Sequence, residues 1–263
     1  MKFFHTCQRL KYPVSERIPK AVWRGTTTGN GPLRSVADVY NNRRVTLARL
    51  GVFTNDTMDV GLTGYVQVTP GSLIDVSVPT VRLSQTNKSD PDVMDALRTL
   101  VPLKPRIGSE DFTKYAGVID VDGNAWSDRL PHLLISAAPV LKQEYYKWFE
   151  YFGHLLTENE VTFFKEDLTD IVQKTNELLH GYKSDRESWE AKLAAAHSFA
   201  EEHLSHLGVV RAMAYSMTKQ ASLQDWTVKL EPDYVKIPRS MCCRLNPSFP
   251  KELVDKMHSN RGS

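Results

Sequence analysis

Residues 115–133 read YAGVIDVDGNAWSDRLPHL. The short apolar run 116–119 predicts a β-strand, and the polar turn after it leads to Ser127, a candidate N-cap for a helix over about 128–137. A strand, a polar turn and a helix start together direct backbone N–H groups and the positive helix end toward an anion. Arg129, in the first turn of that helix, is favourable there if a phosphate lies opposite it. The pattern therefore indicates a phosphate-binding turn, with an ordinary βα unit and polar loop as the alternative.

A second segment, residues 20–31, has the same organisation and reads KAVWRGTTTGNG. A short apolar strand ends at Arg24 and is followed by three glycines and three threonines. Glycine permits close approach of the backbone to a ligand, threonine hydroxyls donate hydrogen bonds, and Arg24 adds positive charge. Neither the Walker spacing nor the Gly-x-Gly-x-x-Gly dinucleotide motif is present. Ser35 and Asp38 then predict a capping box at the start of a helix over about 35–50.

Short apolar runs alternate with helical patterns from residue 20 to about residue 165. The predicted strands are 21–24, 65–68, 73–78, 116–119, 140–142 and 161–164, and the predicted helices lie near 35–50, 92–100, 128–137 and 145–156. Beyond residue 165, apolar residues at i, i+3 and i+4 spacing predict a helical last third. The alternation predicts an α/β fold with a mostly parallel, Rossmann-type sheet, helices on both faces and ligands at the carboxyl ends of the strands.

The composition is that of an ordinary globular protein. Its 263 residues are 41% hydrophobic and 24% charged, which is enough apolar material to bury a core. The 33 basic and 31 acidic residues give a net charge of +2, so the balance does not indicate a nucleic-acid partner. No run of 18 apolar residues predicts a membrane span. Residues 1–60 carry a net charge of +6, which fits an anionic ligand beside the phosphate turns.

Two groups of side chains offer a metal site as an alternative. Asp120 and Asp122, two residues apart at a strand end, could converge on one divalent ion. Arg129 already offers the compensating charge, so we expect no metal there. His203 and His206 lie close together on a predicted helix, but the pattern places no third ligand beside them. We expect these histidines to be surface or packing residues.

Several segments, taken in order, resemble one family. They are 23–29 (WRGTTTG), 119–130 (IDVDGNAWSDRL) and 139–149 (PVLKQEYYKWF), with looser matches at 165–170 and 194–204. The ordered set covers roughly residues 20–220. It is similar to glycosyltransferase family 90, the capsule-associated and protein O-glucosyltransferase group.

The resemblance implies a two-lobed GT-B fold whose C-terminal lobe holds the nucleotide sugar. It also implies an inverting, metal-independent transfer of glucose or xylose, from UDP-glucose or UDP-xylose to a hydroxyl of a protein or polysaccharide, without a cofactor. Carried over by position, the donor-binding residues are Arg24, Gly25, Thr27, Thr28, Asn124, Ala125, Trp126, Ser127, Asp128, Arg129 and Glu144. In this set Arg129 would clamp the diphosphate, and Glu144, just after a strand end, would accept hydrogen bonds from the ribose hydroxyls. Family members usually work in the secretory pathway, in the lumen of the ER or Golgi.

Two departures from the family pattern concern catalysis. In the family roughly a whole lobe precedes the Trp-Arg-Gly segment and supplies an acidic base, whereas 22 residues precede Trp23 here. The Pro-Trp-x-His stretch that usually comes before the strand at 161–164 is absent. We therefore expect an extended lead-in over 1–19, the donor-binding lobe over 20–224 and an extended tail over 225–263.

These departures leave the catalytic base unassigned. Asp56, Asp59 and Asp75, in the polar stretch after the first predicted helix, are candidates, and a partner lobe is another source. The alternative to a complete enzyme is a protein that binds a UDP-sugar without transferring the sugar.

Overall fold

The structure is a computed structural model that describes residues 12–68, 91–135, 138–144 and 150–223. The chain separates into two compact units, Met1–Ser216 and Met217–Ser263. The first unit contains the whole β-sheet, and the second contributes only residues 217–223 to the described ranges. The predicted tail 225–263 lies outside those ranges.

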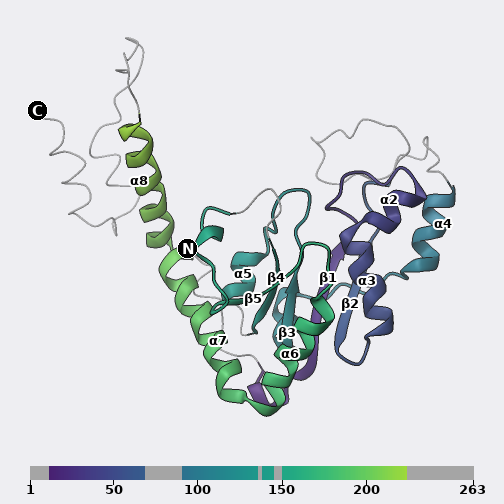
Figure 1. The fold of residues 1–263 in the computed structure, drawn as a ribbon, viewed down its shortest axis with the longest axis horizontal. Helices are drawn as coiled ribbons and strands as arrows, with labels where there is room; N and C mark the ends of the chain where they lie inside the picture. Colours follow the sequence, from purple (N-terminus) through teal and green to yellow (C-terminus); the bar gives the residue numbers. More distant parts are fainter. Residues whose placement is uncertain (1–11, 69–90, 136–137, 145–149, 224–263) are drawn as a thin grey trace, which may run out of the picture. The chain divides into compact units, whose positions relative to one another are not determined.

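The first unit is built on one parallel sheet of five strands (Figure 1). The strands are β1 (Ile18–Thr26), β2 (Met58–Gly64), β3 (Tyr115–Asp120), β4 (Val140–Gln143) and β5 (Val161–Phe164), in the order β2-β1-β3-β4-β5. The chain moves from β1 to β2 on one side and then crosses to β3 on the other side. Such a reversal creates a crevice at the carboxyl ends of the strands, where α/β proteins bind ligands. The prediction of an α/β fold with a parallel sheet is confirmed.

Helices cover both faces of this sheet (Figure 1). The helices of the described ranges are α2 (Val36–Asn41), α3 (Arg43–Phe53), α4 (Pro91–Leu100), α5 (Leu130–Ile135), α6 (Ile171–Ser184), α7 (Arg186–Phe199) and α8 (His206–Ser222), with short helical turns η1 (Val14–Glu16), η2 (Ser109–Lys114), η3 (Gly153–Leu155) and a π-helical turn, η4 (Ala200–Leu204). No residue of α8 belongs to either of the two buried clusters that pack on the sheet. The predicted helical last third is confirmed by α6, α7 and α8.

Two hydrophobic cores result because consecutive strand residues point to opposite faces. Trp23 of β1 and Ile119 of β3 belong to the core that includes α6. Their neighbours Val22 and Val118 belong to the core that includes α5. Burial on both faces explains why these strands read as continuous apolar runs.

The predicted helix over 35–50 is interrupted once. Ser35 caps α2 with the predicted capping box. The backbone then becomes extended at Asn42, with φ −76° and ψ 120°, and the Asn42 side chain accepts hydrogen bonds from the N–H groups of Arg44 and Val45 to begin α3. Asn42 also donates to the Thr27 carbonyl at 3.0 Å, so the break ties the helix to the glycine–threonine turn.

The predicted strand at 65–68 is wrong. The observed strand is β2, which lies earlier and ends at Gly64. Gln67 has a φ of 57°, a left-handed conformation that ends extended backbone. The Tyr65 hydroxyl instead donates to the Val101 carbonyl at 2.6 Å, which joins this turn to the end of α4.

The predicted helix at 145–156 is wrong over its described half. Residues 150–156 form a turn followed by η3, and 145–149 lie outside the described ranges, as does the predicted strand at 73–78. The aromatic spacing that suggested a helix reflects burial of Phe152 against Phe199, with ring centroids 6.1 Å apart.

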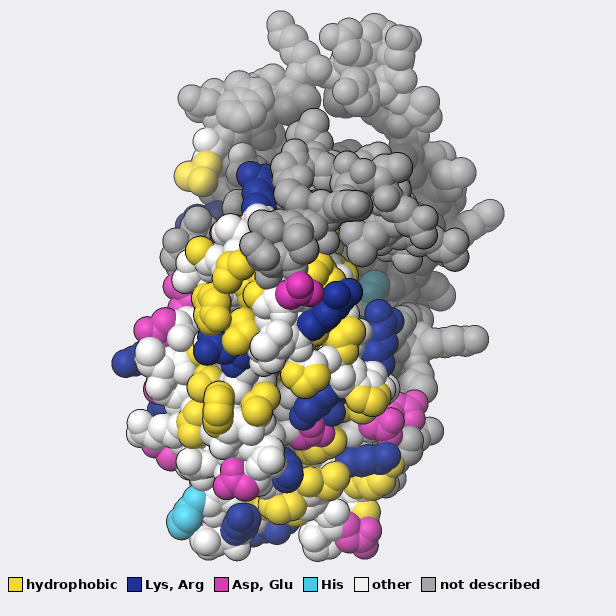
Figure 2. All heavy atoms as spheres, turned by 90° about the vertical axis from the view of Figure 1, so that its right-hand side faces the viewer, with side chains coloured by type: hydrophobic (Ala, Val, Ile, Leu, Met, Phe, Trp, Pro, Cys, Tyr) yellow, Lys and Arg dark blue, Asp and Glu magenta, His cyan; other side chains and the backbone are white. Residues whose placement is uncertain are grey.

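On the side of the first unit where α2, α3 and α4 lie, exposed hydrophobic side chains are interspersed with Lys and Arg (Figure 2). Tyr40, Val52 and Phe53 are exposed there, and the Arg49 guanidinium lies 5.1 Å from the Tyr40 ring centroid. None of the helices in the described ranges is long and apolar enough to span a bilayer.

Candidate functional site

The two predicted phosphate turns, about 95 residues apart in the sequence, meet at the carboxyl ends of β1 and β3. The Gly29 N–H donates to Asn124 Oδ1 at 3.0 Å. Gly29 has a φ of 122°, and an added Cβ would lie 3.3 Å from the Asp122 carbonyl oxygen. Glycine is therefore required here both by its backbone conformation and by the close approach of the second turn.

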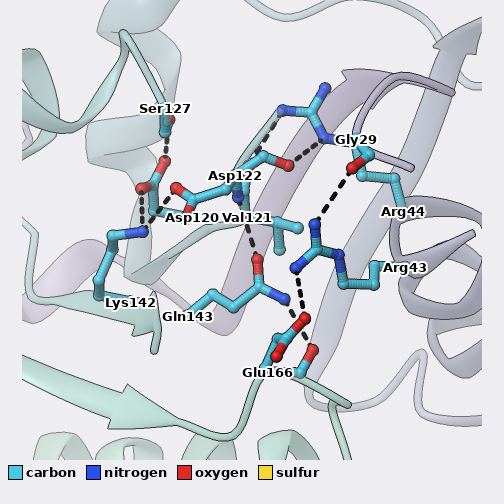
Figure 3. Close-up of polar contacts among 10 residues, drawn as sticks. All are labelled: Gly29, Arg43, Arg44, Asp120, Val121, Asp122, Ser127, Lys142, Gln143 and Glu166. Carbon is cyan, nitrogen blue, oxygen red and sulfur yellow. Dashed lines mark hydrogen bonds and ion pairs between the residues drawn. The ribbon is translucent and has the colours of Figure 1, made fainter. Parts of the chain in front are cut away.

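Arg44, near the start of α3, joins these two turns (Figure 3). Its guanidinium donates to the Thr26 carbonyl at 3.3 Å and to Thr28 Oγ1 at 2.6 Å on one side. On the other side it donates to the carbonyls of Val121 at 3.0 Å and Asp122 at 3.1 Å. The sequence analysis missed this residue because an arginine inside a predicted helix gives no sign that it points into the fold.

A pocket of about 360 Å³ opens beside these turns, at the ends of β1 and β2. Four arginines, Arg24, Arg44, Arg106 and Arg129, contribute to its wall, and no aspartate or glutamate does among the described residues. Concentrating positive charge in a partly enclosed, low-dielectric space favours an anionic ligand. The pocket thus lies where the fold predicts a ligand and has the charge that a phosphate group requires.

Arg44 remains charged in spite of its position. Burial lowers the pKa of Arg44 to about 10, with a further contribution from the positive charge of Arg129. This value is well above neutral pH, so the guanidinium is protonated. The two guanidinium groups repel each other, and a bound anion would offset that repulsion.

Arg24 does not offer a free guanidinium to a ligand. Its Nε donates to the Pro105 carbonyl, its Nη1 to the Trp23 and Asp59 carbonyls, and its Nη2 to both carboxylate oxygens of Asp59 at 3.0 Å. All five N–H donors of an arginine are thereby occupied. Arg24 lines the pocket with its donors engaged by protein acceptors, and its predicted contact with a phosphate stays a prediction.

Asp59 is the centre of that support. Besides Arg24, it accepts from Lys104 Nζ at 2.9 Å and from the Tyr115 hydroxyl at 2.7 Å. Burial alone would raise the pKa of Asp59, but the hydrogen bonds from Arg24, Lys104 and Tyr115 outweigh it and hold the pKa well below its usual range. A carboxylate so strongly stabilised is a weak base, which argues against Asp59 as the catalytic base.

The Asp59 cluster also places Arg106. Lys104 donates its backbone N–H to the Leu62 carbonyl at 2.7 Å and its ammonium to Asp59, which fixes the segment before η2 against β2. Arg106 follows two residues later and is exposed at the pocket wall. The sequence analysis missed Arg106, since its proximity to the two turns depends on this tertiary contact.

Arg129, the predicted diphosphate clamp, lines the pocket as expected. Its Nη1 donates to the Arg24 carbonyl at 2.7 Å, which anchors the half-buried side chain at the edge of β1. Within the described ranges this is the one hydrogen bond of the Arg129 side chain, and the residue lines the pocket. Arg129 and Arg106 therefore carry the charge that is most available to a ligand.

The remaining residues of the first turn have structural partners. The Thr27 hydroxyl is fully buried, donates to the Val66 carbonyl at 2.7 Å and accepts from the Val66 N–H at 2.8 Å. A Cβ on Gly25 would lie 2.4 Å from Trp23 Cζ2, so packing requires this glycine. Thr28 is occupied by Arg44. Of these three residues, only Gly25 lies in the pocket wall.

The second turn departs from its prediction at Ser127. Helix α5 begins at Leu130, so Ser127 is not its N-cap. The buried Ser127 hydroxyl donates instead to Asp120 Oδ1 at 2.5 Å. Ala125, Trp126 and Asp128 are exposed, and Glu144 is exposed just after β4, outside the pocket wall.

Asp120 and Asp122 already have a cationic partner in Lys142 of β4 (Figure 3). The fully buried Lys142 Nζ lies 2.7 Å from Asp122 Oδ1 and 3.6 Å from Asp120 Oδ2. An ammonium group therefore stands between the carboxylates that would bind the ion of an Asp-x-Asp site. In the described ranges no three His, Cys, Asp or Glu side chains form a group that could hold a metal.

At the second candidate metal site, next to the end of α7, His203 packs against an aromatic ring. The His203 ring contacts the Phe199 ring at an interplanar angle of 50°, with centroids 4.6 Å apart, and its Nε2 lies 3.9 Å from Glu202 Oε2. Two potential ligands do not enclose an ion.

Comparison with known families decides the assignment. The sequence model of glycosyl transferase family 90 matches residues 6–261, nearly the whole chain. The chain belongs to glycosyl transferase family 90. No curated protein matches it. As a member of family 90, this glycosyltransferase takes a sugar donor and an acceptor.

Proposed function

We propose that this family 90 protein transfers glucose or xylose from UDP-glucose or UDP-xylose to a hydroxyl group of a protein or polysaccharide. The observation that supports a nucleotide-diphosphate donor is the pocket lined by Arg24, Arg44, Arg106 and Arg129 at the carboxyl ends of the strands. UDP-glucose and UDP-xylose share the UDP group, and its diphosphate carries the negative charge that these arginines complement.

The proposed transfer needs no metal and no cofactor. In a one-step, inverting displacement the bond between the sugar and the diphosphate breaks as the acceptor hydroxyl attacks, and negative charge grows on the departing UDP. Arg129 and Arg106 are placed to stabilise that charge, with Arg44 adding a fixed positive potential behind them. The gain comes from interactions that become stronger as the leaving group becomes more negative.

The acceptor hydroxyl must also lose its proton, and the catalytic base comes from outside the described pocket wall. Asp56 is exposed in the turn before β2, at the amino end of the strands and thus at the opposite edge of the sheet. Asp59 is held by three donors. Asp75 lies outside the described ranges.

The same observation favours one alternative, a UDP-sugar-binding protein without transferase activity. Because the described pocket wall contains arginines and no carboxylate, it provides for binding and not for deprotonation. The two proposals agree on the donor and differ in whether transfer or donor hydrolysis follows. Function in the secretory pathway, in the lumen of the ER or Golgi, remains part of the proposal for the active enzyme.

The test is calorimetric titration of UDP into the purified chain in the presence of EDTA. We expect saturable binding, weakened about 10- to 100-fold by Arg129→Ala, because one or two charge-assisted hydrogen bonds contribute roughly 1.5–3 kcal/mol each. Arg98→Ala is the matched control, since Arg98 is an exposed arginine of α4 outside the pocket wall. Unchanged affinity for UDP in a folded Arg129→Ala protein would show that Arg129 does not bind the diphosphate.

Two further outcomes separate the alternatives. Release of UDP from UDP-glucose or UDP-xylose, with or without an acceptor, supports the enzyme, and binding without release supports the binding protein. Binding that appears only after manganese replaces EDTA would contradict the metal-independent site.

A further inference from the structure

Lys142 is an unusual residue for its position. It lies in β4, a strand of the parallel sheet whose other residues include Val140 and Leu141, and its side chain is completely buried. Removing an ammonium group from water is costly, and buried ion pairs contribute little net stability compared with apolar side chains of similar size. The buried charge of Lys142 is therefore better explained by the positions in which it holds its partners than by a gain in stability.

One set of interactions connects Lys142 to the pocket. Its Nζ lies 3.6 Å from one carboxylate oxygen of Asp120, and the other oxygen of Asp120 accepts the Ser127 hydroxyl at 2.5 Å (Figure 3). Ser127 is 3% exposed and lies outside the pocket wall, yet it is two residues from Arg129. A short series of side-chain interactions thus connects the buried lysine to the segment that carries the proposed clamp.

The beginning of the same turn is held by separate hydrogen bonds. Asp122 Oδ1 accepts from Lys142 at 2.7 Å, the Asp122 N–H donates to Gln143 Oε1 at 3.1 Å, and the Asp122 carbonyl accepts from Arg44. Between Asp122 and Ser127 the residues 124–126 are exposed. The turn is therefore fixed at both ends by buried groups, with a solvent-exposed loop between them.

Fixing the backbone near Arg129 matters because an arginine side chain loses considerable rotamer freedom when it is ordered. A loop that is already in place reduces the ordering that a ligand must cause, and small displacements of a charged group weaken its interaction with the ligand. The Arg129 side chain itself makes one described hydrogen bond, to the Arg24 carbonyl. Its backbone is held on one side by α5, where the His132 and Leu133 N–H groups donate to the Arg129 carbonyl, and on the other side by the segment that includes Ser127.

We infer that Lys142, Asp120 and Ser127 are positioning residues that set Arg129 in the pocket without contacting the donor themselves. The inference rests on the proposed function of Arg129 and adds the group of residues on which that function depends. Ser127 gives the cleanest test, because its removal leaves both carboxylates paired with Lys142.

The experiment is a double-mutant cycle between Ser127→Ala and Arg129→Ala, read by UDP affinity in calorimetry. We expect Ser127→Ala to weaken UDP binding about 5- to 10-fold, which corresponds to the loss of one buried hydrogen bond. In the Arg129→Ala background the same change should have almost no further effect, since the residue that it positions is gone. Ser216→Ala, which removes a hydroxyl bonded to the Ala212 carbonyl on α8, is the matched control.

A merely structural role for Ser127 gives a different result. Full affinity in Ser127→Ala, or a loss that adds fully to the loss in Arg129→Ala, would overturn the inference. Urea unfolding of each variant separates a global loss of stability from a local one. Lys142→Met is a second variant with the same expectation, and the Ser127 series decides the question even if that variant does not fold.

A measurement without ligand distinguishes this inference from the proposed function. Hydrogen exchange of the free Ser127→Ala protein should be faster at amides 124–130 and unchanged in β1 and α6, while Ser216→Ala should match the unsubstituted protein throughout. If the unsubstituted protein binds no UDP, the proposed donor site fails, but faster exchange confined to this turn still supports the tether. Unchanged exchange there rejects the tether, whatever the result with UDP.

Discussion

Replacing Arg44 with methionine keeps an apolar stem of similar length and removes the guanidinium that joins the two turns. The substitution removes four hydrogen bonds of 2.6–3.3 Å, to Thr26, Thr28, Val121 and Asp122. At a net value of about 1 kcal/mol each, with the longest counted as weak, the free energy of unfolding should fall by about 3 kcal/mol. Hydration does not recover this energy, because Arg44 is only 7% exposed and the carbonyl groups that it satisfies would remain without this donor.

The adjacent residue, Arg43, provides the matched control. Its side chain, 16% exposed, pairs with Glu166 at 3.1 Å and donates to the Gly29 carbonyl at 3.1 Å (Figure 3). Glu166 is 38% exposed, so solvent screens the ion pair, and Arg43→Met should cost about 1 kcal/mol. Both substitutions remove one positive charge from the same turn of α3. They differ because the hydrogen bonds of Arg44 are more deeply buried and link both turns.

Urea unfolding followed by tryptophan fluorescence measures both variants. We expect a lower midpoint for Arg44→Met with an unchanged m-value, which indicates reduced stability and not a changed denatured state. The Arg44→Met protein should also bind UDP more weakly than Arg43→Met does, because both turns relax when the link between them is removed. If Arg44→Met is no less stable than Arg43→Met, the argument that Arg44 holds the two turns together is refuted.

Two other predictions concern the support of the pocket. Because hydrogen bonds hold the pKa of Asp59 below its unfolded value, the stability that Asp59 contributes is present above about pH 4 and is lost as the pH falls through the folded pKa. The stability difference between the unsubstituted protein and Asp59→Asn, measured by urea unfolding, should therefore shrink from pH 7 to pH 3, whereas Asp56→Asn, at an exposed turn residue, should change little at either pH. Gly25→Ala should lower stability by about 1–3 kcal/mol, since its Cβ would overlap the Trp23 ring, while Gly181→Ala, in α6 with nothing within 4 Å, should raise it by up to about 1 kcal/mol. Equal effects of the two glycine substitutions on the thermal midpoint would contradict the packing argument.

The local sequence pattern was sufficient to predict secondary structure where a segment's conformation depends mainly on its own residues. The apolar runs at 116–119 and 161–164 became β3 and β5 because strands buried on both faces need continuous apolar sequence. Ser35 and Asp38 formed the predicted capping box because both partners lie within one helical turn. The two turns predicted to bind phosphate do follow strands, and the pocket lies beside them.

Local pattern failed where aromatic or apolar spacing had more than one solution. The sequence around Tyr65 alternates as a strand would, yet Gln67 takes a left-handed conformation and Tyr65 packs on the end of α4. At 150–156 the aromatic spacing matched that of a helix, but in the structure a turn followed by η3 buries Phe152. In both cases interactions with distant residues decided between conformations that the local sequence permits.

The sequence by itself determined the α/β class, the two glycine- and aspartate-containing turns and the family. Tertiary structure decided what the polar side chains do: Arg24 is taken up by Asp59, Arg44 and Arg106 join Arg129 at the pocket, and Lys142 stands between the two aspartates. The physical reason is that a side chain's partners depend on which strands are neighbours. The order β2-β1-β3-β4-β5 brings together residues more than 100 positions apart, and that order is set by the packing of both cores and not by any one segment.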